Sequence, residues 1–322
     1  MRISVAERVF PLKRSFTISR GSRTEARTLV VTIGHRGAVG RGECTPYARY
    51  GETMESVAAA VECLPLPVER RQLQELMPAG AARNAIDCAL WDLEAKLTGK
   101  RVWELAGLDR PDTVSTAYTV SLDTCEKMRA DAAAHSDWPL LKVKLGAGSE
   151  DVDRLRAVRE GAGNARIIVD ANEGWSAGDL KEIAAILPKL GVEMVEQPFP
   201  AGKDSDLAGI SVPVDVCADE GCHDRASLEA LTKGYATVNI KLDKTGGLTE
   251  ALALRGMARR MGYRIMVGCM IGSSLAMAPA VILAQGADIV DLDGPVFLAE
   301  DHFPALRYEG HVVHPPEAAL WG

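Results

Sequence analysis

The chain has 322 residues, of which 47% are hydrophobic and 25% are charged, and its formal net charge is −7. This composition is typical of a globular protein of about two domains, and no run of 18 apolar residues is present to form a membrane span. Charges of both signs are interspersed, which argues against nucleic acid as a partner. Seven scattered cysteines without a C-x-x-C pair, and an N-terminus without a signal-peptide core, predict free thiols and a cytoplasmic location.

Residues 1–112 have the pattern of an α+β domain. Alternation in Arg27–Ile33 and the turn-rich segment Gly34–Gly42 indicate a meander of strands. A helix is expected over Ala81–Leu97, where apolar residues recur at steps of three and four, and Gly99 is placed to end it.

Residues 113–295 alternate short β-rich runs with helical patterns, which is the pattern of parallel βα units. The β-rich runs are Val114–Val120, Leu140–Leu145, Arg166–Asp170, Val192–Glu196, Val214–Asp219, Thr237–Leu242, Arg264–Gly268 and Asp288–Leu292. Eight such strands close into a barrel. Because Pro295 and a proline-rich tail follow the last strand, we expect a modified TIM barrel of the (β/α)7β type. We expect the tail, residues 296–322, to return to the N-terminal α+β capping domain.

Charged residues stand at the ends of the predicted barrel strands, where such barrels carry their active sites. They are Lys142, Lys144, Asp170, Glu196, Asp219, Lys241, Asp291 and Asp293. From Lys142 to Lys241 they recur about once per βα unit, so their side chains are expected at one rim.

The three carboxylates of Asp170, Glu196 and Asp219 come from adjacent predicted strands without a nearby histidine or cysteine. Oxygen ligands of this kind suit Mg²⁺, which keeps open positions for substrate and water. Without a cation, three anions gathered in a half-buried mouth would repel each other. The sequence therefore predicts one magnesium ion per subunit.

Lysines stand on each side of this triad. Lys142 and Lys144 share one face of a strand because residues two apart point the same way. We expect such close ammonium groups, near a divalent cation, to lower each other's pKa and so to supply bases at neutral pH. A metal flanked by two opposed bases suits removal of a proton from one face of a carbon and its return on the other.

Simpler interpretations exist for each motif taken alone. A K-x-K pair is usually a solvated strand edge, an aspartate at a strand end is often a helix N-cap, and Asp291-x-Asp293 could serve turn chemistry. Asp243 and Lys244 are interpreted as surface charges, and Arg20 and Arg23 as candidates for solvated loop charges. Coincidence does not readily explain five charged strand ends in consecutive register.

The ordered set of motifs resembles the muconate-lactonizing subgroup of the enolase superfamily. The motifs are Lys142-Val-Lys144, Asp170-Ala-Asn172, Glu196-Gln-Pro198, Ala218-Asp219-Glu220 and Lys241-Leu-Asp-Lys244-Thr-Gly-Gly247. Asp291-Leu-Asp293-Gly-Pro295 further resembles the dipeptide epimerases, and so do Arg20-Gly-Ser-Arg23, Gly42–Gly51 and the segment around Pro78–Asn84. The match covers nearly the whole chain.

The resemblance implies a role for each of these residues. Asp170, Glu196 and Asp219 would bind Mg²⁺, Lys144 and Lys241 would be the acid/base pair, and Lys142 would support Lys144 and the substrate carboxylate. Asp291 and Asp293 would hold the α-ammonium group of a dipeptide, and Thr119 would contact the substrate. Either Arg20 or Arg23 would bind an acidic side chain.

The implied reaction is epimerisation of a dipeptide, L-Ala-D/L-Glu above all, by two-base proton transfer through an enediolate whose charge the metal stabilises. The implied context is murein peptide metabolism, in a chain that could form a homo-oligomer. Alternatives are an epimerase or racemase of other dipeptides or of N-acylamino acids, an o-succinylbenzoate synthase, a muconate cycloisomerase, and a non-catalytic metal-binding barrel. The lyase and the cycloisomerase have no ammonium group to bind, so Asp291 and Asp293 argue against them.

Overall fold

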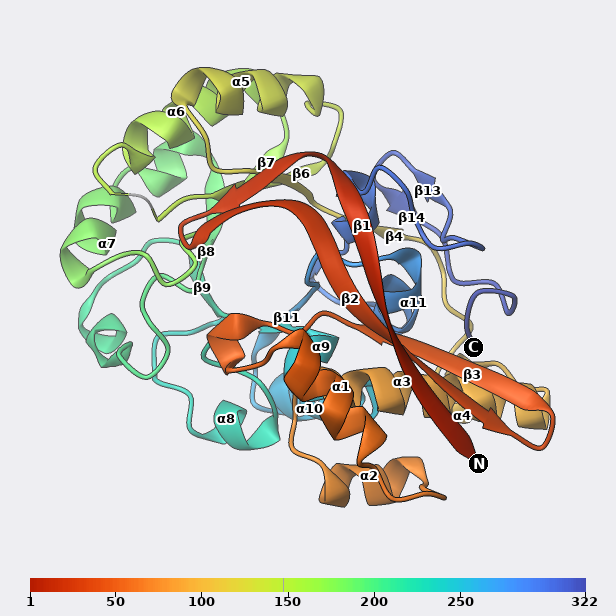
Figure 1. The fold of residues 1–322 in the computed structure, drawn as a ribbon. Coiled ribbons are helices and arrows are strands. Elements are labelled where there is room, and N and C mark those ends of the chain that lie inside the picture. The colour runs from red at the N-terminus through yellow and green to blue at the C-terminus, as the bar shows by residue number, and fades with distance from the viewer. Residues whose placement is uncertain (147) are drawn as a thin grey trace.

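The computed structural model describes residues 1–146 and 148–322. Its N-terminal part is an antiparallel sheet of β1 (Arg2–Ile18), β2 (Gly21–His35) and β3 (Ala38–Cys44). The long β1–β2 hairpin arches over the mouth of the barrel (Figure 1). The predicted meander is therefore present, although its second turn is confined to residues 35–38.

The same part of the chain carries five helices, of which α1 and α3 pack on this sheet while α2 and α4 pack on α3. They are η1 (Ala48–Tyr50), α1 (Met54–Glu62), α2 (Arg70–Leu76), α3 (Ala81–Thr98) and α4 (Val102–Leu105). The predicted helix is α3, and Gly99 ends it in the left-handed conformation at φ 69°. Helix α3 lies so close to β3 that a Cβ atom on Gly42 would sit 2.2 Å from the carbonyl oxygen of Ala85. Glycine at this position lets the helix lie against the strand.

Eight parallel strands form the barrel, in the order of the chain. They are β5 (Tyr118–Val120), β6 (Leu140–Lys144), β7 (Arg166–Asp170), β8 (Val192–Glu196), β9 (Asp215–Ala218), β10 (Thr237–Ile240), β11 (Arg264–Gly268) and β12 (Ile289–Asp291). The amide of Ala117, next to β5, donates to the carbonyl oxygen of Val290 in β12 at 2.8 Å and closes the ring. Leu140, Ile168, Met194 and Met266 belong to a small buried cluster formed mainly by barrel-strand residues. The polar residues of the mouth follow at alternate positions along the same strands.

Helices follow the strands around the outside of the barrel (Figure 1). They are α5 (Cys125–Ala134), α6 (Asp151–Gly161), α7 (Ala177–Ala184), η2 (Leu187–Leu190), η3 (Ser205–Gly209), α8 (Arg225–Glu229), α9 (Leu242–Thr245), α10 (Leu248–Arg260), α11 (Ser274–Leu283) and η4 (Gly294–Phe297). After β12, η4 is the only helix in the part of the chain that the structure describes, as expected for a (β/α)7β barrel. Within that part, no helix is both long and apolar enough to cross a membrane.

The first predicted barrel strand, Val114–Val120, is in fact two strands. β4 (Val114–Ser115) pairs with the tail strand β14 (Val312–Val313), which pairs in turn with β13 (Tyr308–Glu309). Only β5 joins the barrel. The tail then runs back to the N-terminal part, where the indole of Trp321 donates to the carbonyl oxygen of Cys88 in α3 at 3.0 Å.

Buried carboxyl groups join the N-terminal part to the barrel. Asp243 in α9 accepts hydrogen bonds from the amide of Thr45 at 3.0 Å and from the side chain of Asn84 at 2.9 Å. Asp243 is only 8% exposed, so its interpretation as a surface charge is wrong. Burial raises the pKa of Asp243 to about 7, although these two hydrogen bonds oppose the shift.

Replacing Asp243 with Asn should remove a pH-dependent loss of stability. Between its unfolded pKa of 3.8 and its folded pKa of about 7, the folded state holds a proton that the unfolded chain releases, so rising pH lowers the free energy of unfolding. From pH 5 to pH 8, D243N should therefore gain about 2–3 kcal/mol relative to the unsubstituted protein in urea titrations. D137N, at an exposed position, is the control and should show a constant difference. A D243N difference that stays flat would contradict this interpretation.

Candidate active site

The predicted site residues meet at one cavity at the mouth of the barrel. Nine of the eleven line it directly: Arg20, Arg23, Thr119, Lys142, Lys144, Asp219, Lys241, Asp291 and Asp293. The other two, Asp170 and Glu196, are fully buried and contact the lining lysines. The hypothesis that charged strand ends share one rim is confirmed in its geometry.

The lysines of β6 and Lys241, which directly follows β10, face each other across the cavity. β6 and β10 are four positions apart in a closed ring of eight strands, so they lie on opposite sides. Lys144 donates to Asp170 Oδ2 at 2.7 Å, and Lys241 donates to Asp219 Oδ2 at 2.6 Å. Each candidate base is thus held by a carboxylate from the strands between them.

The carboxylates of Asp170, Glu196 and Asp219 end β7, β8 and the segment after β9, with exposures of 0%, 0% and 1%. Lys142 Nζ lies 3.3 Å from Asp170 Oδ2 and 2.7 Å from Glu196 Oε2. The side chain of Asn239 donates to Glu196 Oε1 at 2.7 Å. The side chain of Asn172 donates to Asp170 Oδ2 at 3.2 Å, so the triad is buried among ammonium groups and two side-chain amides.

The triad offers donors of the kind that Mg²⁺ requires. Glu196 Oε2 and Asp219 Oδ1 are buried, and each touches a lysine nitrogen without accepting a well-aligned hydrogen bond. Oxygen atoms with unused lone pairs in a dry site suit a hard cation. Among the described residues, no three His, Cys, Asp or Glu side chains already converge closely enough to enclose an ion. The donor chemistry therefore fits Mg²⁺, while the ammonium groups share the space between the carboxylates.

Carboxylates around the mouth raise the pKa of two of its lysines. Burial alone would lower the pKa of Lys142, but Asp291, Glu196 and Asp170 raise it well above its ordinary value. Asp219 likewise raises the pKa of Lys241 against the effect of burial. Lys142 does lower the pKa of Lys241, as expected for neighbouring ammonium groups, but the surrounding carboxylates outweigh this effect. The expectation for lysines beside a divalent cation stays a prediction.

Two further carboxylates form one wall of the cavity. Lys142 donates to Asp291 Oδ2 at 2.8 Å, and the amide of Thr119 donates to Asp293 Oδ2 at 2.7 Å. Asp293 is 5% exposed and forms no ion pair with any residue that the structure describes. Burial and the nearby Asp291 raise the pKa of Asp293 to about 7. The wall thus presents a buried carboxyl group without a counter-ion.

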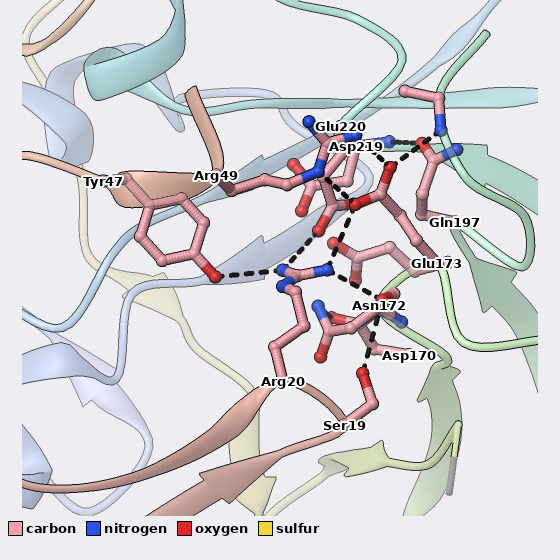
Figure 2. A network of polar contacts seen from close by, with 12 residues as sticks. Ser19, Arg20, Tyr47, Arg49, Asp170, Asn172, Glu173, Gln197, Asp219 and Glu220 are labelled. Atoms are coloured by element: carbon pink, nitrogen blue, oxygen red, sulfur yellow. Dashed lines mark hydrogen bonds and ion pairs between the residues drawn. The ribbon is translucent and has the colours of Figure 1, made fainter. Parts of the chain in front are cut away.

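Arg20, in the turn between β1 and β2, is already engaged with the barrel rim (Figure 2). Its guanidinium donates to Glu220 Oε1 at 2.7 Å, to the carbonyl oxygen of Asn172 at 2.7 Å and to Tyr47 Oη at 3.0 Å. Arg49 reaches the same rim through two hydrogen bonds of 2.6 Å to Glu173. Two arginines of the N-terminal part therefore tie its loops to the segments after β7 and β9.

Arg23 differs from Arg20 in its partners. It lines the cavity, and its guanidinium lies over the ring of Tyr47 at 5.3 Å from the ring centre. No described carboxylate forms an ion pair with it. Of the two candidate arginines, Arg23 is the one with an uncommitted guanidinium group.

Several cavity residues have no signal in the strand-end pattern. Tyr50, Phe16 and Ile18 come from the N-terminal part, and Cys269 and Met270 follow β11 as apolar wall. Their roles depend on loop placement, which residue spacing does not specify. Glu220 belongs to the Ala218-Asp219-Glu220 motif of the sequence, but only the folded structure shows that it pairs with Arg20.

Comparison with known proteins places the whole chain in one family. Residues 1–107 match the mandelate racemase / muconate lactonizing enzyme N-terminal domain, and residues 125–318 match the enolase C-terminal domain-like family. The chain therefore belongs to the mandelate racemase and muconate lactonizing enzymes, which confirms the resemblance stated from the motifs.

Curated relatives and solved structures narrow the comparison. The chain is 46% identical to L-Ala-D/L-Glu epimerase of Escherichia coli (strain K12), covering 97% of this chain and 99% of the relative. It is 42% identical to N-acetyl-D-glutamate racemase of a Pseudoalteromonas species, covering 91% and 95%. An enolase family member from Agrobacterium tumefaciens with homology to dipeptide epimerases, solved with sodium and L-Ala-L-Glu, superposes with a TM-score of 0.97 at 49% identity, over 99% of both chains. A dipeptide epimerase from Methylococcus capsulatus, complexed with Mg and L-Arg-D-Lys, superposes with a TM-score of 0.88 at 32% identity, over 98% of this chain and 97% of that one.

Proposed function

We propose that this protein catalyses the Mg²⁺-dependent epimerisation of a dipeptide at the α-carbon of its second residue, with L-Ala-D/L-Glu as the favoured substrate. The observation that carries the proposal is the placement of Lys144 and Lys241 on opposite sides of one cavity with buried carboxylates between them. The relatives that act on or bind such dipeptides support the substrate class.

Some residues of the chain would hold the substrate, and others would transfer protons. An α-carbon bound in the cavity would lie between the two lysines. A neutral amine on one side removes the α-proton, and the ammonium group on the other side returns a proton to the opposite face. Lys142 contacts Asp170, Glu196 and Asp291 and offsets part of their negative charge, which would let a substrate carboxylate approach. The loops tied down by Arg20 and Arg49 exclude water from this space.

The metal would be held by Asp170, Glu196 and Asp219. When bound, Mg²⁺ neutralises the carboxylates that now raise the lysine pKa values, and it stabilises negative charge that develops on the substrate carboxylate.

A second candidate is racemisation of an N-acylated glutamate, which the Pseudoalteromonas relative suggests. An N-acyl group carries no positive charge. Asp293 presents a buried carboxyl group without an ion-pair partner among the described residues, and a free α-ammonium group would supply the missing cation. This wall therefore favours a dipeptide over an N-acylamino acid, an o-succinylbenzoate precursor or a muconate.

The wider setting is also a proposal. We place the protein in the cytoplasm, since its seven cysteines are all free thiols. An Ala-Glu dipeptide would connect it with murein peptide metabolism, and self-association into a homo-oligomer remains a prediction. The functional division at residues 112/113 is supported by the family matches, which leave residues 108–124 between them, and by the tail's contact with α3.

Activity should depend on a divalent cation. Three buried carboxylates at the reacting end need a counter-charge that leaves the lysines free to exchange protons. Exhaustive chelation should lower epimerase activity on L-Ala-L-Glu by about three orders of magnitude or more, and added Mg²⁺ should restore it. Undiminished activity after chelation would contradict the metal assignment.

Replacing either Lys144 or Lys241 with Ala should lower the epimerisation rate by about 10²–10⁴-fold, because each supplies one of two proton transfers. Each variant should still exchange the α-proton of one epimer with deuterium from D₂O, and the two variants should prefer opposite epimers. Proton NMR measures both exchange and inversion. Lys127, an exposed lysine that forms an ion pair with Asp123, supplies the control K127A, which should epimerise normally. Near-normal epimerisation by both K144A and K241A would exclude the two-base mechanism.

Specificity should divide between the two ends of the dipeptide. N-acetyl-L-Ala-L-Glu cannot compensate Asp293, and this should cost about 2–5 kcal/mol, or about 30-fold or more in kcat/KM relative to L-Ala-L-Glu. At the other end, the uncommitted Arg23 should hold the glutamate side chain through its planar fork. Comparison of L-Ala-L-Glu with L-Ala-L-Gln measures this contact.

Arg20 supplies the matched control for the side-chain contact. R23A should reduce the preference for Glu over Gln by about tenfold. R20A should instead raise KM for both dipeptides alike, because it loosens the contact with Glu220. Equal rates on free and acetylated dipeptides would remove the role of Asp293 and favour the N-acylamino acid reaction. An unchanged Glu preference in R23A would remove the role of Arg23.

A further inference from the structure

Lys244 is a charged residue of the mouth that the proposed reaction does not use. It lies in α9, three residues after Lys241, and is only 1% exposed, so its interpretation as a surface charge is wrong. It does not line the cavity that Lys142, Lys144 and Lys241 share. An ammonium group buried in this way is costly to desolvate, and a neutral side chain of similar size would avoid that cost.

The ammonium group of Lys244 is surrounded by oxygen atoms of the barrel. It donates to the carbonyl oxygens of Asp219 at 2.5 Å, Asn239 at 2.8 Å and Cys222 at 2.9 Å. It also lies 2.6 Å from Asp219 Oδ1. An ammonium group has three N–H donors, so three carbonyls and one carboxylate occupy it completely. Lys244 therefore has no donor left for a substrate.

These contacts control two of the three carboxylates of the triad. Lys244 holds both the backbone and the side chain of Asp219, while Lys241 takes the other carboxylate oxygen. Lys244 also holds the backbone of Asn239, whose side chain donates to Glu196 Oε1 at 2.7 Å. One buried cation thus links the end of β9 to the end of β10 beneath the carboxylates.

We infer that Lys244 is a positioning residue for metal binding, which orients Asp219 directly and Glu196 through Asn239. The inference rests on the proposed role of these carboxylates as Mg²⁺ ligands. Side chains that orient metal ligands from behind commonly change metal affinity about 10–100-fold when they are replaced.

The test is calorimetric titration of Mg²⁺ into metal-free protein, compared between the unsubstituted chain, K244M and K244Q. Met fills similar space without donors, and Gln keeps N–H donors on a shorter side chain without the charge. Both variants should bind Mg²⁺ about tenfold more weakly or worse. Urea titrations and circular dichroism should show that at least one of them is folded.

D243N is the matched control, because Asp243 precedes Lys244 on the same short helix but contacts the N-terminal part of the chain. D243N should bind Mg²⁺ normally. Normal affinity in a folded Lys244 variant would overturn the inference, and so would equal weakening in D243N. Failure of both Lys244 variants to fold would assign the residue to barrel stability and overturn it too. Absence of Mg²⁺ binding by the unsubstituted chain would instead overturn the proposed function, and this inference with it.

Discussion

Mutual neutralisation of buried charges at the mouth of the barrel is the interaction on which the site depends. Four ammonium groups and four carboxylates lie there at exposures below 10%, and desolvation penalises every one of them when it is unpaired. They are Lys142, Lys144, Lys241, Lys244, Asp170, Glu196, Asp219 and Asp291. Because each charge needs its neighbours, the cluster forms only when the ends of β6 to β10 and β12 are brought together. Closure of the barrel and assembly of the site are therefore one event.

Because the barrel strands follow one another in chain order around the ring, strand ends that are four βα units apart in the sequence lie on opposite sides of the mouth. Residues two apart on a parallel strand share a face, and consecutive strands are neighbours, so charged strand ends spaced by one βα unit must form an arc around the mouth. Four strands in a ring of eight make half a turn, which places Lys241 opposite Lys144. This arrangement of charged strand ends could be predicted from the sequence, because it follows from the two-residue period of a strand, the order of the strands and the closure of the barrel. The predicted ends of β6, β7 and β8 are within one residue of those observed.

Contacts between distant loops could not be predicted in this way. In the sequence, Arg20 and Arg23 are equivalent loop arginines. Only the folded hairpin shows that Arg20 pairs with Glu220, while Arg23 forms no ion pair with a described carboxylate. Asp243 and Lys244 looked like solvent-exposed charges because they follow a strand in a polar stretch. Their burial arises because α9 is a single turn pressed between the barrel and α3, an arrangement that has no local periodic signal. The first predicted strand was wrong for a similar reason, since its first residues pair with a tail nearly 200 residues away.

The lysines of the mouth all carry ammonium groups, but they differ in whether they border the cavity. This difference in access to a substrate separates their roles. Lys244 has every donor directed at fixed oxygen atoms and faces no cavity, so moving its proton would leave buried acceptors unpaired. Lys144 and Lys241 each donate to one carboxylate oxygen and border the open space. Because Asp219 raises the pKa of Lys241, a change in the charge of that carboxylate alters the proton affinity of Lys241 at the edge of the cavity. Under the proposed function the substrate completes the same electrostatic pattern. Its ammonium group meets Asp293, its side-chain carboxylate meets Arg23, and its α-carbon lies between Lys144 and Lys241, which border the cavity from opposite sides.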